Sequence, residues 1–385
     1  MISRFLCRPS VAGWPRTLCR RHLPTRDSSI PCAGWAPSEN SRLSTLPRKV
    51  AILGAGAIGC FVGTHWASVC HAAGIKLTLI GRAATWETLT PGPLRVTGGQ
   101  TLETPLSMLD LQDSPATLAD ADLILLAHKS TGLQESIEQI RGNASEGATI
   151  VSLLNGVSPV DHLREALPNH EVVAGMVPFN VVWKSGNHLH RSSTGELALQ
   201  RCRTSEALQG MVAGTGVPIQ LHGDLKPLQY GKLLLNLINP INALSGLPLH
   251  TMLCQRAYRR VYAEVLREAL SVYDAARIDW QKVGPLSPRF VHRLLLLPNA
   301  LFNNTLLKIQ RLDINSMTSM AADLAAGRPT EIETLTNEIL RLAERSDTAA
   351  PYNTAISDLI RQAEAVGPPS QVWSAHALLN QLGIT

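Results

Sequence analysis

The run 49-KVAILGAGAIG-59 decides the fold of this chain. Its first residues are apolar and suit a strand buried in a parallel sheet, and a helical pattern follows over residues 60–74. The glycines stand in GxGxxG spacing, which permits a tight turn, close approach of the backbone to a pyrophosphate, and close packing of the helix on the strand. Free N–H groups at the helix start would face the anion. The candidate cofactor-binding residues are therefore Gly54, Ala55, Gly56, Ala57, Ile58 and Gly59.

A second apolar run, residues 75–80, is followed directly by Gly81 and Arg82. NAD-binding folds usually carry Asp or Glu at this point to hold the ribose 2′-hydroxyl. A guanidinium can pair with a 2′-phosphate instead. Arg82 therefore favours NADP(H) over NAD(H), although the same residue could simply be an exposed loop arginine.

Two further runs, residues 122–129 and 148–156, also have the character of buried strands. The first ends in His128 and Lys129, and the second ends in Asn155 and Gly156. Ligands of an open α/β sheet bind beyond the carboxyl ends of the strands, so these residues are candidates for the cofactor side. Residues 172–200 contain additional strand-like runs.

Beyond residue 222 the pattern becomes helical. Leu- and Ala-rich segments with helical spacing occupy residues 228–246, 256–276, 287–296, 314–326 and 331–345. The sequence therefore predicts an α/β protein with a Rossmann-type doubly wound sheet followed by an all-helical part. We expect an NADP-binding domain over residues 48–222 and a helical substrate-binding domain over residues 223–385.

The run 231-GKLLLNLINPINAL-244 places polar groups on a helix that is otherwise apolar. At 100° per residue, Lys232, Asn236 and Asn239 lie within about 60° of one another. Such groups cost ~1–3 kcal/mol each if buried without partners, so a substrate rich in oxygen atoms would satisfy them. Backbone carbonyls or helix ends are the alternative partners. Pro240 cannot donate to the carbonyl of Asn236, which predicts a kink or an end of the helix there.

The stretch 316-SMTSMAADLAAGRPTEI-332 holds two more candidates, Ser319 and Glu331. Gly327 and Pro329 between them predict a helix stop and the first turn of the next helix. Glu331 would then lie near a helix N-terminus, where the dipole favours a carboxylate.

Taken together, these motifs resemble the ketopantoate reductase (2-dehydropantoate 2-reductase) family over roughly residues 49–365. The resemblance implies NADPH-dependent reduction of 2-dehydropantoate to (R)-pantoate, a step towards pantothenate and coenzyme A. It implies Lys232 as general acid with Glu331 as its partner, and substrate contacts from Asn236, Asn239, Ser319 and Lys129. Lys129, Asn155 and Glu331 would border the cofactor. The family has a second asparagine eight residues after the lysine, where this chain has Pro240.

Two other functions remain open from the sequence. One is an NADP-dependent reductase of another 2-oxo acid or of an opine-like substrate, and the other is a non-catalytic NADP(H)-binding protein. A binder has no use for an acid at the hydride site, which favours an enzyme. The partner we expect is a small-molecule 2-oxo acid, and the oligomeric state is open, with a homodimer among the alternatives.

Residues 1–47 have the Arg- and Ser-rich, acid-poor composition of an organelle transit peptide, which indicates mitochondrial targeting, with a cytoplasmic protein as the alternative. Residues 1–49 carry a net charge of +7 within a total of +5, which leaves −2 for the rest. A nucleic-acid surface is therefore not expected. The sequence contains no run of ~18 apolar residues, so no membrane-spanning helix is expected. The seven scattered cysteines, without a CxxC pair, predict free thiols and no metal site.

Overall fold

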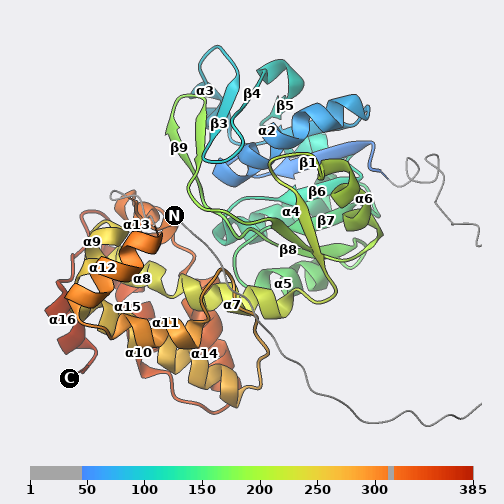
Figure 1. Ribbon diagram of the computed structural model, residues 1–385. Helices are drawn as coiled ribbons and strands as arrows, with labels where there is room; N and C mark the ends of the chain where they lie inside the picture. The colour runs from blue at the N-terminus through green and yellow to red at the C-terminus, as the bar shows by residue number, and fades with distance from the viewer. Residues whose placement is uncertain (1–45, 311–315, 385) are drawn as a thin grey trace, which may run out of the picture.

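The computed structural model describes residues 46–310 and 316–384 and is built around an eight-stranded sheet (Figure 1). The strand order is β12-β11-β8-β7-β6-β1-β2-β5, and neighbours are parallel except that β11 runs antiparallel to β8. The strands are β1 (Lys49–Leu53), β2 (Lys76–Ile80), β5 (Asp110–Gln112), β6 (Leu123–Leu126), β7 (Thr149–Ser152), β8 (Val172–Met176), β11 (Leu197–Gln200) and β12 (Ile219–His222). Its first six strands in chain order are arranged 3-2-1-4-5-6, as in the Rossmann fold, which confirms the predicted fold class.

Helices cover both faces of this sheet, because the sheet strands are apolar on both sides. Val50 and Ile52 of β1 pack towards α2 (Ala57–Ala72) and α6 (Arg203–Val212). Ala51 and Leu53 pack towards the opposite face, which α4 (Leu133–Asn143) and α5 (Ser158–Ala166) cover. All five residues of β1 are buried, which explains the unbroken apolar run over residues 50–53.

A second, four-stranded sheet with the order β4-β3-β10-β9 packs against α2. It comprises β3 (Leu94–Thr97), β4 (Leu102–Thr104), β9 (Val181–Ser185) and β10 (His188–Arg191). The guanidinium of Arg191 lies 4.3 Å from the ring centre of Phe179 at the join between the two sheets. The sequence indicated strands over residues 172–200 but not β3 and β4, which are only four and three residues long.

All elements after β12 are helical within the described residues, as predicted. They are α7 (Lys226–Asn236), α8 (Ile238–Ser245), α9 (Leu249–Cys254), α10 (Arg256–Ala275), α11 (Pro288–Leu295), α12 (Asn299–Gln310), α13 (Ser319–Ala325), the 3₁₀ turn η4 (Ile332–Thr334), α14 (Thr336–Arg345), α15 (Pro351–Val366) and α16 (Ala375–Gln381). Helix α10 is central and packs against α8, α11, α14, α15 and α16. The division of the chain into domains at residue 222 stays a prediction.

The helix expected over residues 228–246 is in fact two helices, α7 and α8, which meet at Leu237. Pro240 lies in the first turn of α8, where its missing N–H has no intrahelical partner to lose. The sequence predicted a kink or an end of the helix at Pro240; the interruption lies three residues earlier, at Leu237, and the segment expected as one helix is two.

The stop after α13 follows the prediction more closely. Gly327 has a φ of 64°, and its N–H donates to the backbone carbonyl of Leu324. The backbone N–H of Arg328 donates to the backbone carbonyl of Asp323 at 2.9 Å. This is a Schellman motif, which satisfies the last carbonyls of α13. Pro329 does not begin the next helix, because η4 starts three residues later. The predicted helix over 331–345 therefore begins as a 3₁₀ turn, with Glu331 as its N-cap residue.

The proposed leader lies almost entirely outside the described residues. Leu46 and Pro47 are described: Pro47 is buried, and Leu46 packs against the core on the α2 side of the sheet. Across residues 46–310 and 316–384, no helix combines the length and the apolar character needed to span a membrane.

Candidate active site

The dinucleotide turn lies at the point where the strand order of the large sheet reverses, between β1 and β6. Gly54 has a φ of 111°, and a Cβ there would stand 2.4 Å from the backbone nitrogen of His128. A Cβ at Gly59 would stand 2.2 Å from the carbonyl oxygen of Gly54. These glycines are therefore required by the packing of the turn itself. The turn sits where open α/β sheets bind their ligands.

The residues of this turn fit an anionic dinucleotide. Gly56 is the N-cap residue of α2, no side chain caps the helix, and its first turn has no acidic residue. A Cβ at Gly56 would meet nothing within 4 Å, so the space beside this backbone is open. The helix start thus offers unblocked N–H groups to a phosphate.

Arg82 is close to the same turn. It is exposed and is the N-cap residue of α3 (Ala83–Glu87), directly after β2. A Cβ at the preceding residue, Gly81, would lie 2.6 Å from the Cβ of Ala55, so the two loops are in contact. Among the described residues Arg82 has no carboxylate partner, which leaves its guanidinium available to a ligand.

Three predicted site residues form one hydrogen-bonded chain between the sheet and the helical part. The Lys232 ammonium, on α7, donates to Asn155 Oδ1 at 2.7 Å. Asn155 follows β7, and its Nδ2 donates to Glu331 Oε2 at 2.9 Å. We expected Glu331 to pair with Lys232 directly, but within the described residues no ion pair joins them, and the amide of Asn155 stands between. The Asn155 amide therefore links the two charged groups by one hydrogen bond to each.

The other side of Glu331 is held by Ser130, in the 3₁₀ turn η3 (Ser130–Gly132) after β6. Its backbone N–H and its hydroxyl both donate to Glu331 Oε1 at 3.0 Å. Glu331 is 5% exposed, so these donors and Asn155 satisfy a buried carboxylate. The loop after Asn155 also packs tightly here, since a Cβ at Gly156 would lie 2.5 Å from the carbonyl oxygen of Thr334.

Burial lowers the pKa of Lys232 from its ordinary value of 10.5 to about 8, and the attraction of the Glu331 carboxylate offsets only part of that effect. An amine with this pKa is partly protonated at neutral and mildly alkaline pH. It can therefore donate a proton and be recharged from solvent, as a general acid must.

A small cavity of about 10 Å³ adjoins the Lys232 ammonium. Its lining residues are Leu154, Asn155, Gly156, Met176, Gln229, Lys232, Leu233 and Asn236. This volume holds about one water molecule, so an organic acid can enter only if the loop after β7 and helix α7 move apart. Lys232 and Asn236 share the cavity, as the polar stripe predicted. Asn239 does not line it, because the break at Leu237 moves it to α8.

Lys129 is engaged elsewhere in the structure. Its ammonium forms an ion pair with Asp323 on α13, and Arg328 Nε contacts the same carboxylate oxygen at 3.0 Å. Asp323 is 1% exposed, and its second oxygen is buried without a partner. This cluster ties the end of β6 to the helical part beside Glu331. A substrate contact from Lys129 stays a prediction.

The remaining polar residues of the two motifs divide into structural and exposed groups. Asn242 is fully buried: its Nδ2 donates to the Leu247 carbonyl at 2.8 Å, and its Oδ1 accepts from the Thr318 N–H at 3.0 Å. It thereby fixes the start of α13 against α8. Ser319 is exposed in the first turn of α13, and the Thr318 hydroxyl next to it points to the carbonyl of Asn239. The substrate roles of Ser319 and Asn239 stay predictions.

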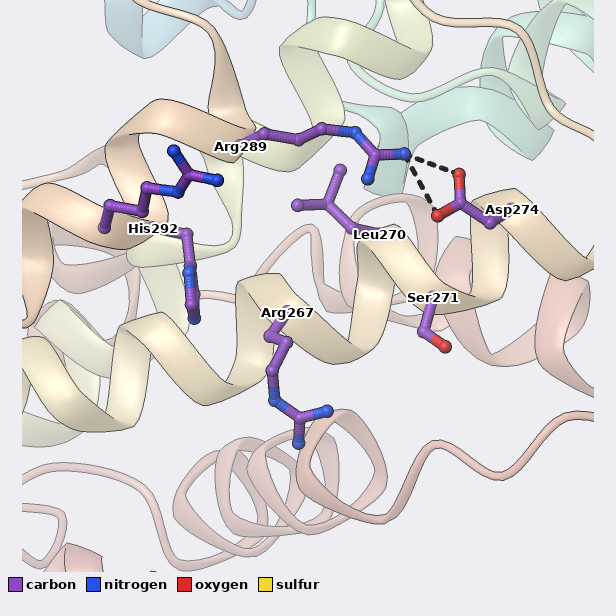
Figure 2. Close-up of a pocket in the computed structure, with 7 residues that line it drawn as sticks. Arg267, Leu270, Ser271, Asp274, Arg289 and His292 are labelled. Atoms are coloured by element: carbon purple, nitrogen blue, oxygen red, sulfur yellow. Dashed lines mark hydrogen bonds and ion pairs between the residues drawn. The ribbon is translucent and has the colours of Figure 1, made fainter.

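A larger cavity, of about 370 Å³, lies between α10 and α11 (Figure 2). Its lining residues are Arg267, Leu270, Ser271, Asp274, Arg289, His292 and Arg293, none of which is a predicted site residue. Arg289 is paired with Asp274 at 2.7 Å, as the dashed lines in Figure 2 mark. Size alone does not identify the active site here, because this cavity is far from the dinucleotide turn in the fold and lacks the cluster around Lys232.

A Rossmann sheet with a dinucleotide-type turn, together with a partly buried lysine hydrogen-bonded to the loop after β7, fits an oxidoreductase that uses a nicotinamide cofactor. The family model for ketopantoate reductase PanE/ApbA matches residues 50–203, and the model for the C-terminal part of the same family matches residues 224–364. The chain belongs to the ketopantoate reductase family.

Individual relatives agree with this assignment. The 2-dehydropantoate 2-reductase of Halobacterium salinarum is 24% identical over 329 residues, which cover 83% of this chain and 100% of the relative. The crystal structure of a PanE/ApbA family ketopantoate reductase from Ralstonia eutropha JMP134 is 25% identical, with a TM-score of 0.68 over 83% of this chain and 99% of that one. D-mandelate dehydrogenase with NADH and anilino(oxo)acetate is 20% identical and shares the fold, with a TM-score of 0.64 over 83% of this chain and 99% of that one.

The structure adds site residues that the sequence did not single out. Ser130, Gln229 and Met176 belong to the hydrogen-bonded chain or line its cavity, and Asp323 engages Lys129. Only Ser130 left a signal in the sequence, because it follows Lys129 at the end of a predicted strand. The others come from segments that meet only in the folded chain.

Proposed function

We propose that this protein reduces 2-dehydropantoate to (R)-pantoate with NADPH, a reaction that leads towards pantothenate and coenzyme A. The observation that carries the proposal is the chain of hydrogen bonds from Lys232 through Asn155 to Glu331. It supplies a proton donor with a pKa of about 8 at the carboxyl edge of a dinucleotide-binding sheet. Membership of the ketopantoate reductase family supports the same reaction.

In the reaction we propose, the bound nicotinamide supplies the hydride to the substrate carbonyl. The carbonyl oxygen gains negative charge as the hydride arrives, and the Lys232 ammonium stabilises this oxygen and then protonates it. Asn155 orients the ammonium, and the Glu331 carboxylate offsets its positive charge until the proton is transferred and again when the amine is reprotonated. Asn236 lies along the same cavity, where it can hold a substrate oxygen.

NADP(H) rather than NAD(H) is proposed because Arg82 follows β2 directly and lies beside the dinucleotide turn. A free guanidinium pairs well with a 2′-phosphate, whereas the 2′-hydroxyl of NAD(H) is normally held by an acidic residue. Among the described residues no acidic group takes that place directly after β2.

A second candidate is the reduction of another 2-oxo acid. It is favoured by Pro240, which stands where the family has its second asparagine, and by the likeness in fold to D-mandelate dehydrogenase. The purified chain should therefore be tested by following NADPH and NADH oxidation with a panel of 2-oxo acids. The proposal requires 2-dehydropantoate with NADPH to give the highest kcat/KM, and a clear preference for an aromatic 2-oxo acid or for NADH would overturn it.

Mitochondrial targeting is also a proposal. Its support is the composition of residues 1–47, which lie mostly outside the described residues. Imaging of the full chain with a C-terminal fluorescent tag, beside a version that starts at Leu46, tests it. Mitochondrial signal from the full chain alone supports the proposal, and a diffuse signal from both contradicts it.

A further inference from the structure

Glu331 is held in place by a residue that does not itself contact the Lys232 cavity. Ser130 gives two donors, its N–H and its hydroxyl, to the same oxygen of Glu331. Both residues are buried, at 8% and 5% exposed. A buried residue whose backbone N–H and side-chain hydroxyl both donate to one carboxylate oxygen fixes the orientation of that carboxylate.

The direction of each hydrogen bond around Ser130 can be assigned. Its hydroxyl has one hydrogen, and the charged oxygen of Glu331 is the stronger acceptor for it. The Thr334 hydroxyl, 2.6 Å from the Ser130 oxygen, must therefore be the donor in that contact. Its other acceptor, the Glu331 carbonyl, is more distant at 3.4 Å.

The same logic fixes the amide of Asn155. With Ser130 occupying Oε1, the other Glu331 oxygen faces Asn155 Nδ2, and Asn155 Oδ1 is left to face the ammonium of Lys232. If the carboxylate moved away from Asn155, Nδ2 would lose its acceptor, and that contact would no longer prevent the amide from flipping and presenting its N–H groups to the ammonium. Two donors would then oppose each other in a buried site, which disfavours the protonated lysine.

We propose that Ser130 is a positioning residue: by holding Glu331, it keeps the Asn155 oxygen on the Lys232 ammonium and so keeps the proton on the lysine. The inference rests on the proposed function only for its catalytic consequence. The geometry itself is independent of the substrate. Thr334 assists by donating to the Ser130 oxygen, which polarises the serine hydroxyl and strengthens its hydrogen bond to the carboxylate.

The test measures the Lys232 proton directly in the full chain. Side-chain ¹⁵N NMR of labelled lysine, with the Lys232 signal assigned from Lys232→Arg, gives its titration midpoint without substrate. In Ser130→Ala the midpoint should fall by about half a pH unit. The hydrogen bond from the serine hydroxyl to Glu331 is lost, and the carboxylate is then held less firmly against Asn155. Ser130→Thr, which keeps the hydroxyl, should restore it.

Two more variants complete the design. Ser357→Ala removes a buried serine hydroxyl that donates to Asn337 at 2.6 Å, away from Glu331, and should leave the midpoint unchanged. Thr334→Val removes only the donor to Ser130 and should lower the midpoint by less than Ser130→Ala does. An unchanged midpoint in Ser130→Ala, or the same fall in Ser357→Ala, overturns the proposal. If Ser130→Ala does not fold, an unchanged midpoint in Thr334→Val overturns it instead.

Activity measurements separate this inference from the proposed function. If no 2-oxo acid is reduced, the proposed function fails while the titration still decides the role of Ser130. If 2-dehydropantoate is reduced, Ser130→Ala should lower kcat above pH 7 and leave KM within about twofold, because Ser130 does not line the cavity. A change confined to KM would contradict a positioning role.

Discussion

Replacing Glu331 by glutamine is the most informative perturbation of the site, because it removes a charge and keeps the shape. In the native chain every donor faces an acceptor from Lys232 to Ser130. A glutamine must turn its NH₂ either towards Asn155 or towards Ser130, and both present donors there. A flip of Asn155 only moves the conflict to the ammonium of Lys232. Glu331→Gln therefore leaves one buried donor opposed in every arrangement.

The effect on Lys232 can be worked from the distances. The ammonium and the carboxylate are at most about 8 Å apart, because two hydrogen bonds of 2.7 Å and 2.9 Å and one amide group lie between them. At that distance, two unit charges attract by about 2 kcal/mol with an effective dielectric of about 20. Loss of this attraction lowers the pKa of Lys232 by about 1–1.5 units from its value of about 8. The protonated fraction at pH 7.5 then falls from about three quarters to between about a quarter and a tenth.

The assay is kcat for 2-oxo acid reduction as a function of pH. The ammonium is the active form, so the rate is full at low pH and is lost as the pH rises through the pKa of Lys232. The alkaline inflection should move from about 8 to about 7 in Glu331→Gln. Glu333→Gln is the matched control: Glu333 lies on the adjacent turn η4 and pairs at the surface with Arg361. An inflection that stays at the same pH in Glu331→Gln would refute the coupling of the two charges.

Three further predictions concern other parts of the chain. Arg82→Ala should weaken NADPH binding about ten- to hundredfold and barely affect NADH binding, because a charged contact of ~1.5–3 kcal/mol is lost. Fluorescence titration measures both affinities. Arg95→Ala, which breaks a surface contact with Glu103, serves as the control. Asn242→Ala should lower the free energy of unfolding by about 2–3 kcal/mol, because it leaves the Thr318 N–H and the Leu247 carbonyl without a hydrogen-bond partner. The kcat should stay near normal. A large fall in kcat would contradict a purely structural role for this asparagine. Removal of residues 1–45 should leave a folded enzyme with unchanged kcat. Removal of Leu46 and Pro47 as well should lower the melting temperature, because Leu46 packs against the core and Pro47 is buried. Loss of activity after removal of residues 1–45 alone would refute this.

The dinucleotide turn was predictable because its requirements are local. Gly54 and Gly59 are constrained by atoms a few residues away or on the adjacent strand, and the apolar run of β1 directly reflects burial on both faces. The change from strands to helices after His222 follows from hydrophobic spacing in the same way. These features depend on period and turn chemistry, which a sequence displays.

The arrangement of the site was predictable only in part. Lys232 and Asn236 do share a cavity, because residues four apart on one unbroken helix lie only about 40° apart around its axis. Asn239 does not line that cavity, because the helix breaks at Leu237, and the amide between Lys232 and Glu331 comes from a loop 77 residues before the lysine. Contacts between distant segments depend on how the sheet and the helices pack together. The pairing of Lys129 with Asp323, 194 residues apart, escaped prediction for the same reason.

The central claim is that Lys232 donates the proton, and Lys232→Ala tests it most directly. Turnover, NADPH affinity and melting temperature should be measured on one preparation, beside Lys226→Ala, which removes an exposed lysine of the same helix that pairs with Asp161. The account predicts a loss of ~10²–10⁴ in kcat for Lys232→Ala. It predicts little change in NADPH affinity, because it assigns the cofactor phosphates to the turn at Gly56 and not to Lys232. A kcat near that of the unaltered protein, accompanied by a lower melting temperature, would mean that Lys232 only braces the helix, and would contradict the claim.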